Sequence, residues 1–183
     1  LHIALWVAGI KTNDEVILPS FTFIASAEAI VLTGAKPIFV DINPQTYNID
    51  PRKIEGKITP KTKAILPVHL YGQCADMDAL GLVAREFKLH MIEDAAQAAG
   101  ATWNGARAGS MGLAAAFSFY PTKNLSAFGD AGALTTSDPE LAEHVRSLRD
   151  QRRSLASAAS HRIARGSMTV NVAWKLVDEY LAN

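Results

Sequence analysis

TKAILPVHLYGQCADMDALGLVAREFKLHMIED (residues 62–94) contains the pattern that decides the fold. Its first part, residues 62–70, is an apolar run, its last part, residues 89–94, is a second one, and both are typical of strands. Between them, apolar residues recur at helical spacing from Met77 to Phe87, with Asp76 or Asp78 placed to cap the helix. Two strands separated by a helix of this length predict a right-handed crossover and therefore parallel strands.

The same alternation extends in both directions from this unit. Further strands are predicted at the apolar runs before Pro19, in KPIFVDI, in AAFSF and at 131–137, and helices at residues 1–10, 21–34, after Pro51 and from Asp138. We therefore expect an α/β fold of three layers, a mostly parallel sheet with helices on both faces. Residues 1–150 would form this domain, while residues 151–183 would be an atypical linker, at about 151–168, followed by a C-terminal helix.

Composition narrows the classes of function. Eighteen basic residues balance eighteen acidic ones, so nothing favours nucleic acid as a partner. The single cysteine, Cys74, excludes an internal disulfide and a cysteine-ligated metal site, and it fits a cytoplasmic location. No segment has the roughly 18 apolar residues that cross a membrane. We expect a cytoplasmic protein with neither metal nor membrane partner.

Polar residues that follow strands are the first candidates for a site, because ligands of open α/β sheets bind beyond the carboxyl ends of the strands. Asp94 ends an apolar strand, where an ionised carboxylate implies a cationic partner. Lys123 follows the strand AAFSF in a loop shaped by Pro121, and a lysine in such a place can act as a nucleophile. Taken alone, Asp94 could be a helix cap or an ion-pair partner, and Lys123 could be a solvated surface lysine.

Two motifs and their spacing resemble one family. EDAAQAAG (93–100), the lysine of SFYPTKNL 29 positions after Asp94, and GDAGALTT (129–136) are similar to the signature of the DegT/DnrJ/EryC1/StrS aminotransferases, over about Leu1 to Asp150. The resemblance implies the large domain of the fold-type I fold and pyridoxal 5'-phosphate as cofactor. Lys123 would then form the Schiff base and shuttle a proton, and Asp94 would pair with the pyridine nitrogen.

Three further residues match positions that contact the cofactor in this family. Ser118 would bind the phosphate, Phe23 would stack on the ring, and Gln97 would reach its phenolic side. Without the resemblance, Phe23 would be read as core and Ser118 as a strand serine with a backbone partner. His69 also lies at a strand end, but such a histidine is more often a satisfied structural group, so it is not included among the catalytic residues.

The resemblance implies transfer of an amino group, with glutamate as the expected donor, to a keto sugar linked to a nucleotide, by a homodimer with its sites at the interface. The related sugar dehydratases have histidine in place of the lysine, and Lys123 argues against them. A catalytically inactive fragment or a dimerisation or regulatory remnant is the alternative from another class.

The sequence departs from the family pattern at both ends. A Gly-Thr turn that binds the cofactor phosphate would stand just before Leu1, and QRRSLASAASHRIARGSM (151–168) matches no family segment. We therefore expect a domain that is incomplete at its N-terminus, lacks the small C-terminal domain and binds the cofactor more weakly than a full-length enzyme.

Overall fold

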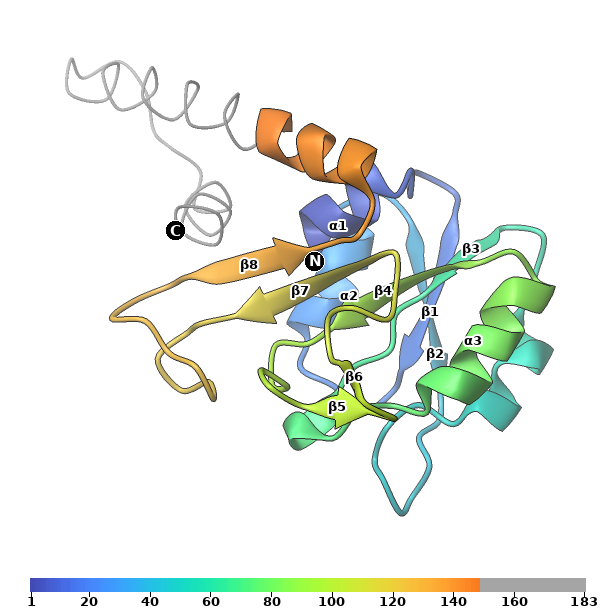
Figure 1. Ribbon diagram of the computed structural model, residues 1–183. Coiled ribbons are helices and arrows are strands. Elements are labelled where there is room, and N and C mark those ends of the chain that lie inside the picture. The colour runs from blue at the N-terminus through green and yellow to red at the C-terminus, as the bar shows by residue number, and fades with distance from the viewer. Residues whose placement is uncertain (149–183) are drawn as a thin grey trace.

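The computed structural model describes residues 1–148, and they form a three-layer α/β domain (Figure 1). The central sheet has the strand order β2-β1-β3-β4-β7-β8. Its strands are β1 (Glu15–Pro19), β2 (Lys36–Val40), β3 (Thr62–Ile65), β4 (His90–Asp94), β7 (Ala114–Ser118) and β8 (Gly132–Thr135). Every neighbouring pair is parallel except β7 and β8, so the predicted, mostly parallel sheet is confirmed.

Helices cover both faces of the sheet, as expected (Figure 1). One face carries α1 (His2–Val7), α2 (Ala25–Val31) and the helical residues 139–148; the other carries α3 (Met77–Glu86) with the 3-10 turns η1 (Pro51–Lys53) and η2 (Glu55–Lys57). Strand residues alternate between the two cores: Val16 and Leu18 pack with the α1 and α2 side, and Ile17 with the α3 side. Burial on both faces explains why these strands read as continuous apolar runs.

The structure differs from the sequence prediction in the bounds of one strand and one helix, and it contains a hairpin that was not predicted. The strand predicted through residue 70 ends at Ile65, although Val68 still bridges Asp94 beyond it. The helix predicted over 21–34 is shorter, because α2 begins at Ala25 and ends at Val31. A two-stranded hairpin, β5 (Thr102–Trp103) and β6 (Ala106–Arg107), was not predicted. The cap of α3 is Asp76, whose carboxylate accepts the Ala79 N–H at 3.0 Å.

Across the described residues, no helix is both long enough and apolar enough to cross a membrane. The linker and helix predicted within 151–183 lie outside the described residues.

Candidate functional site

The site forms where β4 and β7 end side by side. These strands pair in parallel with Asp94 opposite Ala116, and the Ala95 N–H donates to the Ala116 carbonyl at 2.9 Å. Ser118 ends β7 two residues later, and Lys123 follows within the next loop. The pairing therefore brings the loop of Lys123 to the edge of the sheet at which Asp94 lies.

Asp94 is a buried carboxylate held by two hydrogen bonds. Its Oδ2 accepts the Ser26 hydroxyl at 2.7 Å, and its Oδ1 accepts the Ala96 N–H at 3.1 Å. Among residues 1–148, no Lys, Arg or His side chain forms an ion pair with it. The cationic partner that the sequence implies is therefore not supplied by a described side chain.

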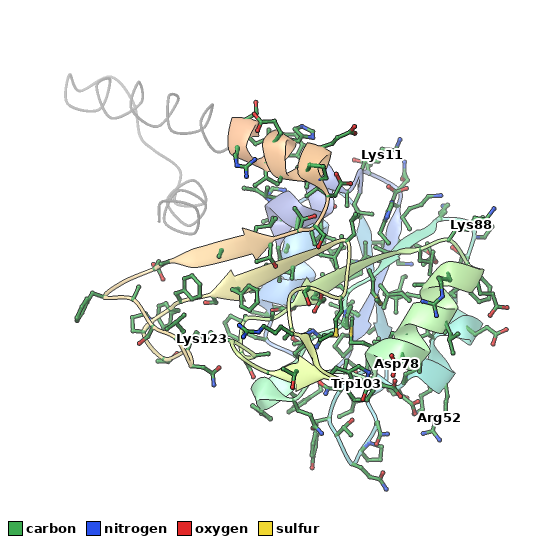
Figure 2. All side chains as sticks on the ribbon, viewed as in Figure 1. Lys11, Arg52, Asp78, Lys88, Trp103 and Lys123 are labelled. Carbon is green, nitrogen blue, oxygen red and sulfur yellow. The ribbon has the colours of Figure 1, made fainter. Side chains whose placement is uncertain are left out.

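Lys123 lies in a turn that follows β7 (Figure 2). Its backbone N–H donates to the Tyr120 carbonyl at 2.8 Å, and the loop folds back on itself because the Ala127 N–H donates to the Phe119 carbonyl at 2.8 Å. The lysine is half-buried, and within the described part of the chain its amine takes part in no ion pair. Asp94 and Lys123 thus lie on neighbouring elements, and no ion pair joins their side chains.

Gln97 has its side-chain amide oriented by one backbone group. Its Oε1 accepts the Tyr71 N–H at 2.8 Å, so the amide NH₂ is left as the donor that can point to a ligand. Tyr71 adopts a left-handed conformation, with φ of 54°, in the 3-10 turn η3 (Leu70–Gly72). A donor held in this way suits an anionic oxygen.

Phe23 and Ser118 differ in their burial. Phe23 precedes α2 and is 67% exposed, so its ring is available to stack and is not part of the core of the described chain. Ser118 is buried, and its Oγ accepts the Tyr120 N–H at 3.4 Å. The alternative prediction that Phe23 is a core residue is therefore wrong. For Ser118, the alternative of a strand serine with a backbone partner agrees with its contact to Tyr120.

His69 is the satisfied structural group that the sequence suggested. It is fully buried; its Nε2 lies 2.9 Å from Glu93 Oε2, and its Nδ1 accepts the Ala75 N–H at 3.2 Å. Because Glu93 and Asp94 are consecutive in a strand, they point to opposite faces of the sheet. The His69 side chain therefore lies on the α3 side, away from the Asp94 side chain, although the His69 N–H donates to the Asp94 carbonyl at 3.0 Å.

Ser26 and Thr22 were missed by the sequence reasoning. Ser26 donates to Asp94, and the two hydroxyl oxygens of Thr22 and Ser26 lie 3.1 Å apart. One indication of their role is present in the sequence: both residues lie in the segment after β1, at the same edge of the sheet as the other candidates. Without coordinates, a serine in a predicted helix gives no indication of a contact 68 residues away.

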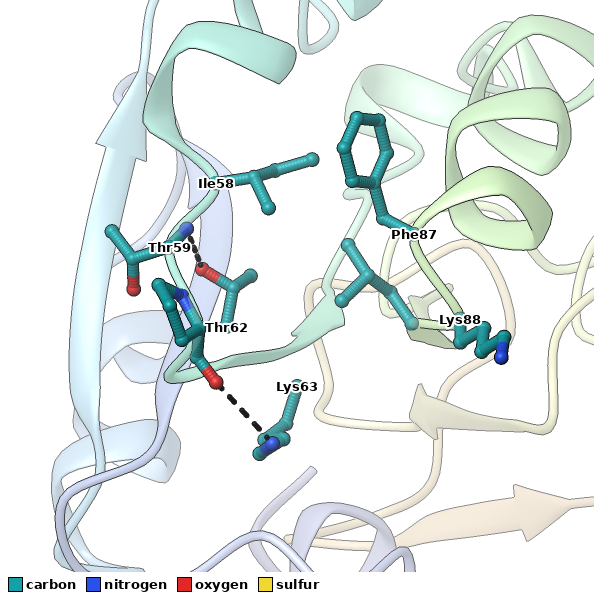
Figure 3. Close-up of a pocket in the computed structure, with 8 residues that line it drawn as sticks. Ile58, Thr59, Thr62, Lys63, Phe87 and Lys88 are labelled. Atoms are coloured by element: carbon teal, nitrogen blue, oxygen red, sulfur yellow. Dashed lines mark hydrogen bonds between the residues drawn. The ribbon is translucent and has the colours of Figure 1, made fainter.

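A hollow of the described surface lies elsewhere. It has a volume of about 500 Å³ and lies at the start of β3 and β4, the opposite edge of the sheet from Asp94 (Figure 3). Its lining includes Lys63 and Lys88 but no carboxylate. The hydrogen-bonded carboxylate at the other edge is chemically more specific than this open hollow, so the candidate site stays at Asp94.

Comparison with known proteins identifies the family of the chain. The family model described as the DegT/DnrJ/EryC1/StrS aminotransferase family matches residues 1–172, which continues past Asp150, where the resemblance was expected to end. A dTDP-3-amino-3,4,6-trideoxy-alpha-D-glucose transaminase of Streptomyces venezuelae is 54% identical over 150 residues, 82% of this chain and 40% of that protein. A UDP-2-acetamido-2-deoxy-3-oxo-D-glucuronate aminotransferase of Pseudomonas aeruginosa is 49% identical over 148 residues, 81% of this chain and 41% of that protein.

Two solved structures are also similar to this chain. The S. venezuelae protein DesV, in complex with a ketimine intermediate, is 54% identical with a TM-score of 0.79 and is matched over 81% of this chain and 40% of its own. NtdA of Bacillus subtilis, with bound cofactor PMP, is 46% identical with a TM-score of 0.73, over 79% of this chain and 32% of its own. The present chain spans about 40% of the length of the curated relatives it matches.

Proposed function

Because the chain belongs to the DegT/DnrJ/EryC1/StrS aminotransferase family, we propose that it carries the cofactor site of a pyridoxal-phosphate-dependent aminotransferase. The amino group would come from glutamate and pass to a keto sugar linked to a nucleotide, the substrate class to which the names of the two sugar aminotransferases above refer. The observation that carries the proposal is the buried Asp94 carboxylate, which has two neutral donors and no cationic side chain among residues 1–148.

The described residues fit pyridoxal phosphate in chemical type. A protonated pyridine nitrogen is a cation with one N–H, which is what an ionised, hydrogen-bonded Asp94 can accept. Gln97 offers an amide donor, which suits the phenolic oxygen, and the exposed ring of Phe23 offers a stacking face. Ser118 would donate its hydroxyl to the phosphate.

Each residue then has a distinct task. Bound pyridoxal phosphate supplies the electron sink that stabilises negative charge on the carbon next to the nitrogen. Asp94 would hold the proton on the ring nitrogen, and Lys123 would hold the cofactor and afterwards accept and return the proton at the reacting carbon. Lys123 suits this task because it is half-buried on the neighbouring element and engaged in no described ion pair.

Exposed apolar side chains on and beside α2 support self-association. Ile24, Val31 and Leu32 are each more than half exposed, and exposed apolar side chains gathered on one element mark an interaction surface. We propose a homodimer, and sedimentation equilibrium of the chain is the test: a monomer at all concentrations would contradict it.

A non-catalytic role is the second candidate. The matched residues cover 40% and 41% of the two sugar aminotransferases named above, so the match does not include the contacts made by the rest of those proteins. A fragment that retains the site could bind the cofactor without completing the transfer.

One spectroscopic experiment tests the proposal. The chain is mixed with pyridoxal phosphate, and the visible absorption band of protein-bound cofactor is recorded for the wild type, Lys123→Ala and Lys88→Ala. Lys88 is exposed and far from Lys123 (Figure 2), so its variant controls for nonspecific reaction with surface amines. We expect the band to be lost only in Lys123→Ala. Glutamate should then shift the wild-type spectrum; a band that glutamate leaves unchanged would favour the non-catalytic role.

A further inference from the structure

The contact between Ser26 and Asp94 joins two elements that are distant in sequence. Ser26 lies in the first turn of α2 and is 1% exposed, and its Oγ lies 2.7 Å from Oδ2 of Asp94 at the end of β4. A hydroxyl donating to a carboxylate at this distance forms a charge-assisted hydrogen bond, which is about twice as strong as a neutral one.

The direction of the hydrogen bonds follows from the proton count. An ionised carboxylate cannot donate, so the single hydroxyl proton of Ser26 goes to Asp94. Ser26 Oγ can then only accept from Thr22 Oγ1, which lies 3.1 Å away and is half-buried. The three residues form an ordered relay in which Thr22 donates to Ser26 and Ser26 donates to Asp94.

This relay complements the backbone contact of the carboxylate. Oδ1 is held by the Ala96 N–H of the loop after β4, and Oδ2 is held from α2 by Ser26. Donors on both oxygens fix the plane of a carboxylate. Each oxygen can accept more than one hydrogen bond, so a lone pair stays available for a cationic N–H.

We propose that Ser26 is a positioning residue of the site, which fixes the Asp94 carboxylate for the ring nitrogen of pyridoxal phosphate and is itself oriented by Thr22. The inference rests on the proposed function, because it assigns Asp94 to that nitrogen. Without the Ser26 hydroxyl, Asp94 Oδ2 loses its donor, the carboxylate turns more freely, and its charge is shared less with Ser26 and more with the ring N–H. The proton shared with the ring nitrogen then moves toward the carboxylate, and the cofactor is held less tightly.

A purely structural tether between α2 and β4 would behave differently. The helix also packs through Ala27 and Ile30 against the sheet, so losing one hydroxyl would lower stability without changing the electronic state of a bound ligand. The protonation of the cofactor ring therefore separates the two roles.

The test uses the 183-residue chain with pyridoxal phosphate labelled with ¹⁵N in the ring. In the wild type, we expect the ¹⁵N signal of a protonated ring. Ser26→Ala should move this signal toward that of the neutral ring and raise the dissociation constant about tenfold, the scale of one hydrogen bond to a charged group. Ser26→Thr keeps the hydroxyl and should restore both values.

Each outcome decides a separate point. A wild type that binds no cofactor overturns the proposed function and this inference together. A wild type that binds, with Ser26→Ala giving an unchanged ring signal, overturns the inference alone. If Ser26→Ala does not fold, Thr22→Val decides instead: it removes the donor to Ser26, so a smaller shift in the same direction supports the relay, and no shift overturns it.

Discussion

His69 and Glu93 form a fully buried hydrogen bond, with His69 Nε2 lying 2.9 Å from Glu93 Oε2. Because His69 Nδ1 accepts the Ala75 N–H, the ring proton is on Nε2 and is donated to the carboxylate. Glu93 accepts three more hydrogen bonds, from the backbone N–H groups of Gly109, Met111 and Gly112, at 2.6 to 2.8 Å. One carboxylate therefore ties β4 to the segment after β3 and to the loop before β7.

Replacing this carboxylate should strongly destabilise the domain. In the wild type, both carboxylate oxygens of Glu93 accept hydrogen bonds from N–H groups. In Glu93→Gln, an amide NH₂ replaces one of these oxygens, so at least one buried N–H loses its acceptor. Leaving a buried polar group without its partner costs about 1 to 3 kcal/mol per group. Urea unfolding followed by circular dichroism measures the loss, with the exposed Glu143→Gln as the control. A loss below about 1 kcal/mol would show that the network contributes little.

Acid should remove the same stabilisation in the wild type. Burial alone would raise the pKa of the Glu93 carboxyl, but the hydrogen bonds from His69, Gly109 and Gly112 outweigh it and hold that pKa below its usual value. A group whose pKa is lowered by folding stabilises the fold above its unfolded pKa and loses this contribution as pH falls through the folded pKa. The free energy of unfolding should therefore fall below about pH 4.3. Glu93→Gln should show a flatter pH dependence, and equal slopes would contradict the assignment.

The fold was largely predictable from sequence because its pattern is strong. Strands buried on both faces give apolar runs, and the α3 helix has apolar spacing with an aspartate cap. The β5 and β6 hairpin was missed because its strands have two residues each, too short for any period to appear. The early end of β3 was missed because the apolar run continues through Leu66 and Val68, which are buried without belonging to the strand.

The candidate site was predictable only in part. Asp94 and Ser118 end strands, Gln97 and Lys123 lie in the loops that follow, and parallel pairing brings these strand ends to one edge. Their functional roles come from the resemblance and stay predictions. The contacts of Ser26 with Asp94 and of Tyr71 with Gln97 could not be predicted, because both depend on how loops distant in sequence pack together.

Asn48 should be essential for the shape of the loop beside Gln97. Its side chain is buried, donates to the carbonyls of Gln73 and Cys74 at 3.0 and 3.1 Å, and accepts the Leu70 N–H at 3.1 Å. Asn48→Ala leaves these backbone groups without partners and should cost about 2 to 3 kcal/mol.

Hydrogen exchange of the Leu70 and Tyr71 amides measures the local effect of Asn48→Ala. Both amides should exchange faster, since the loop that presents Tyr71 to Gln97 is released. The exposed Asn124→Ala serves as the control and should leave both rates unchanged. Unchanged exchange in Asn48→Ala would mean that other contacts hold the loop.

Gly109 and Gly105 offer a matched pair that separates backbone strain from a lack of space. Both have positive φ, 89° and 84°, so alanine at either position carries a similar conformational cost of about 1 to 2 kcal/mol. A Cβ at Gly105 would meet nothing within 4 Å, whereas one at Gly109 would collide with the ring of Phe117 in β7. Gly109→Ala should therefore lose about 1 to 3 kcal/mol more than Gly105→Ala in urea unfolding. Equal losses in the two variants would show that the Phe117 ring moves aside freely. The loop held by Glu93 would then not depend on the close approach of Gly109 to β7.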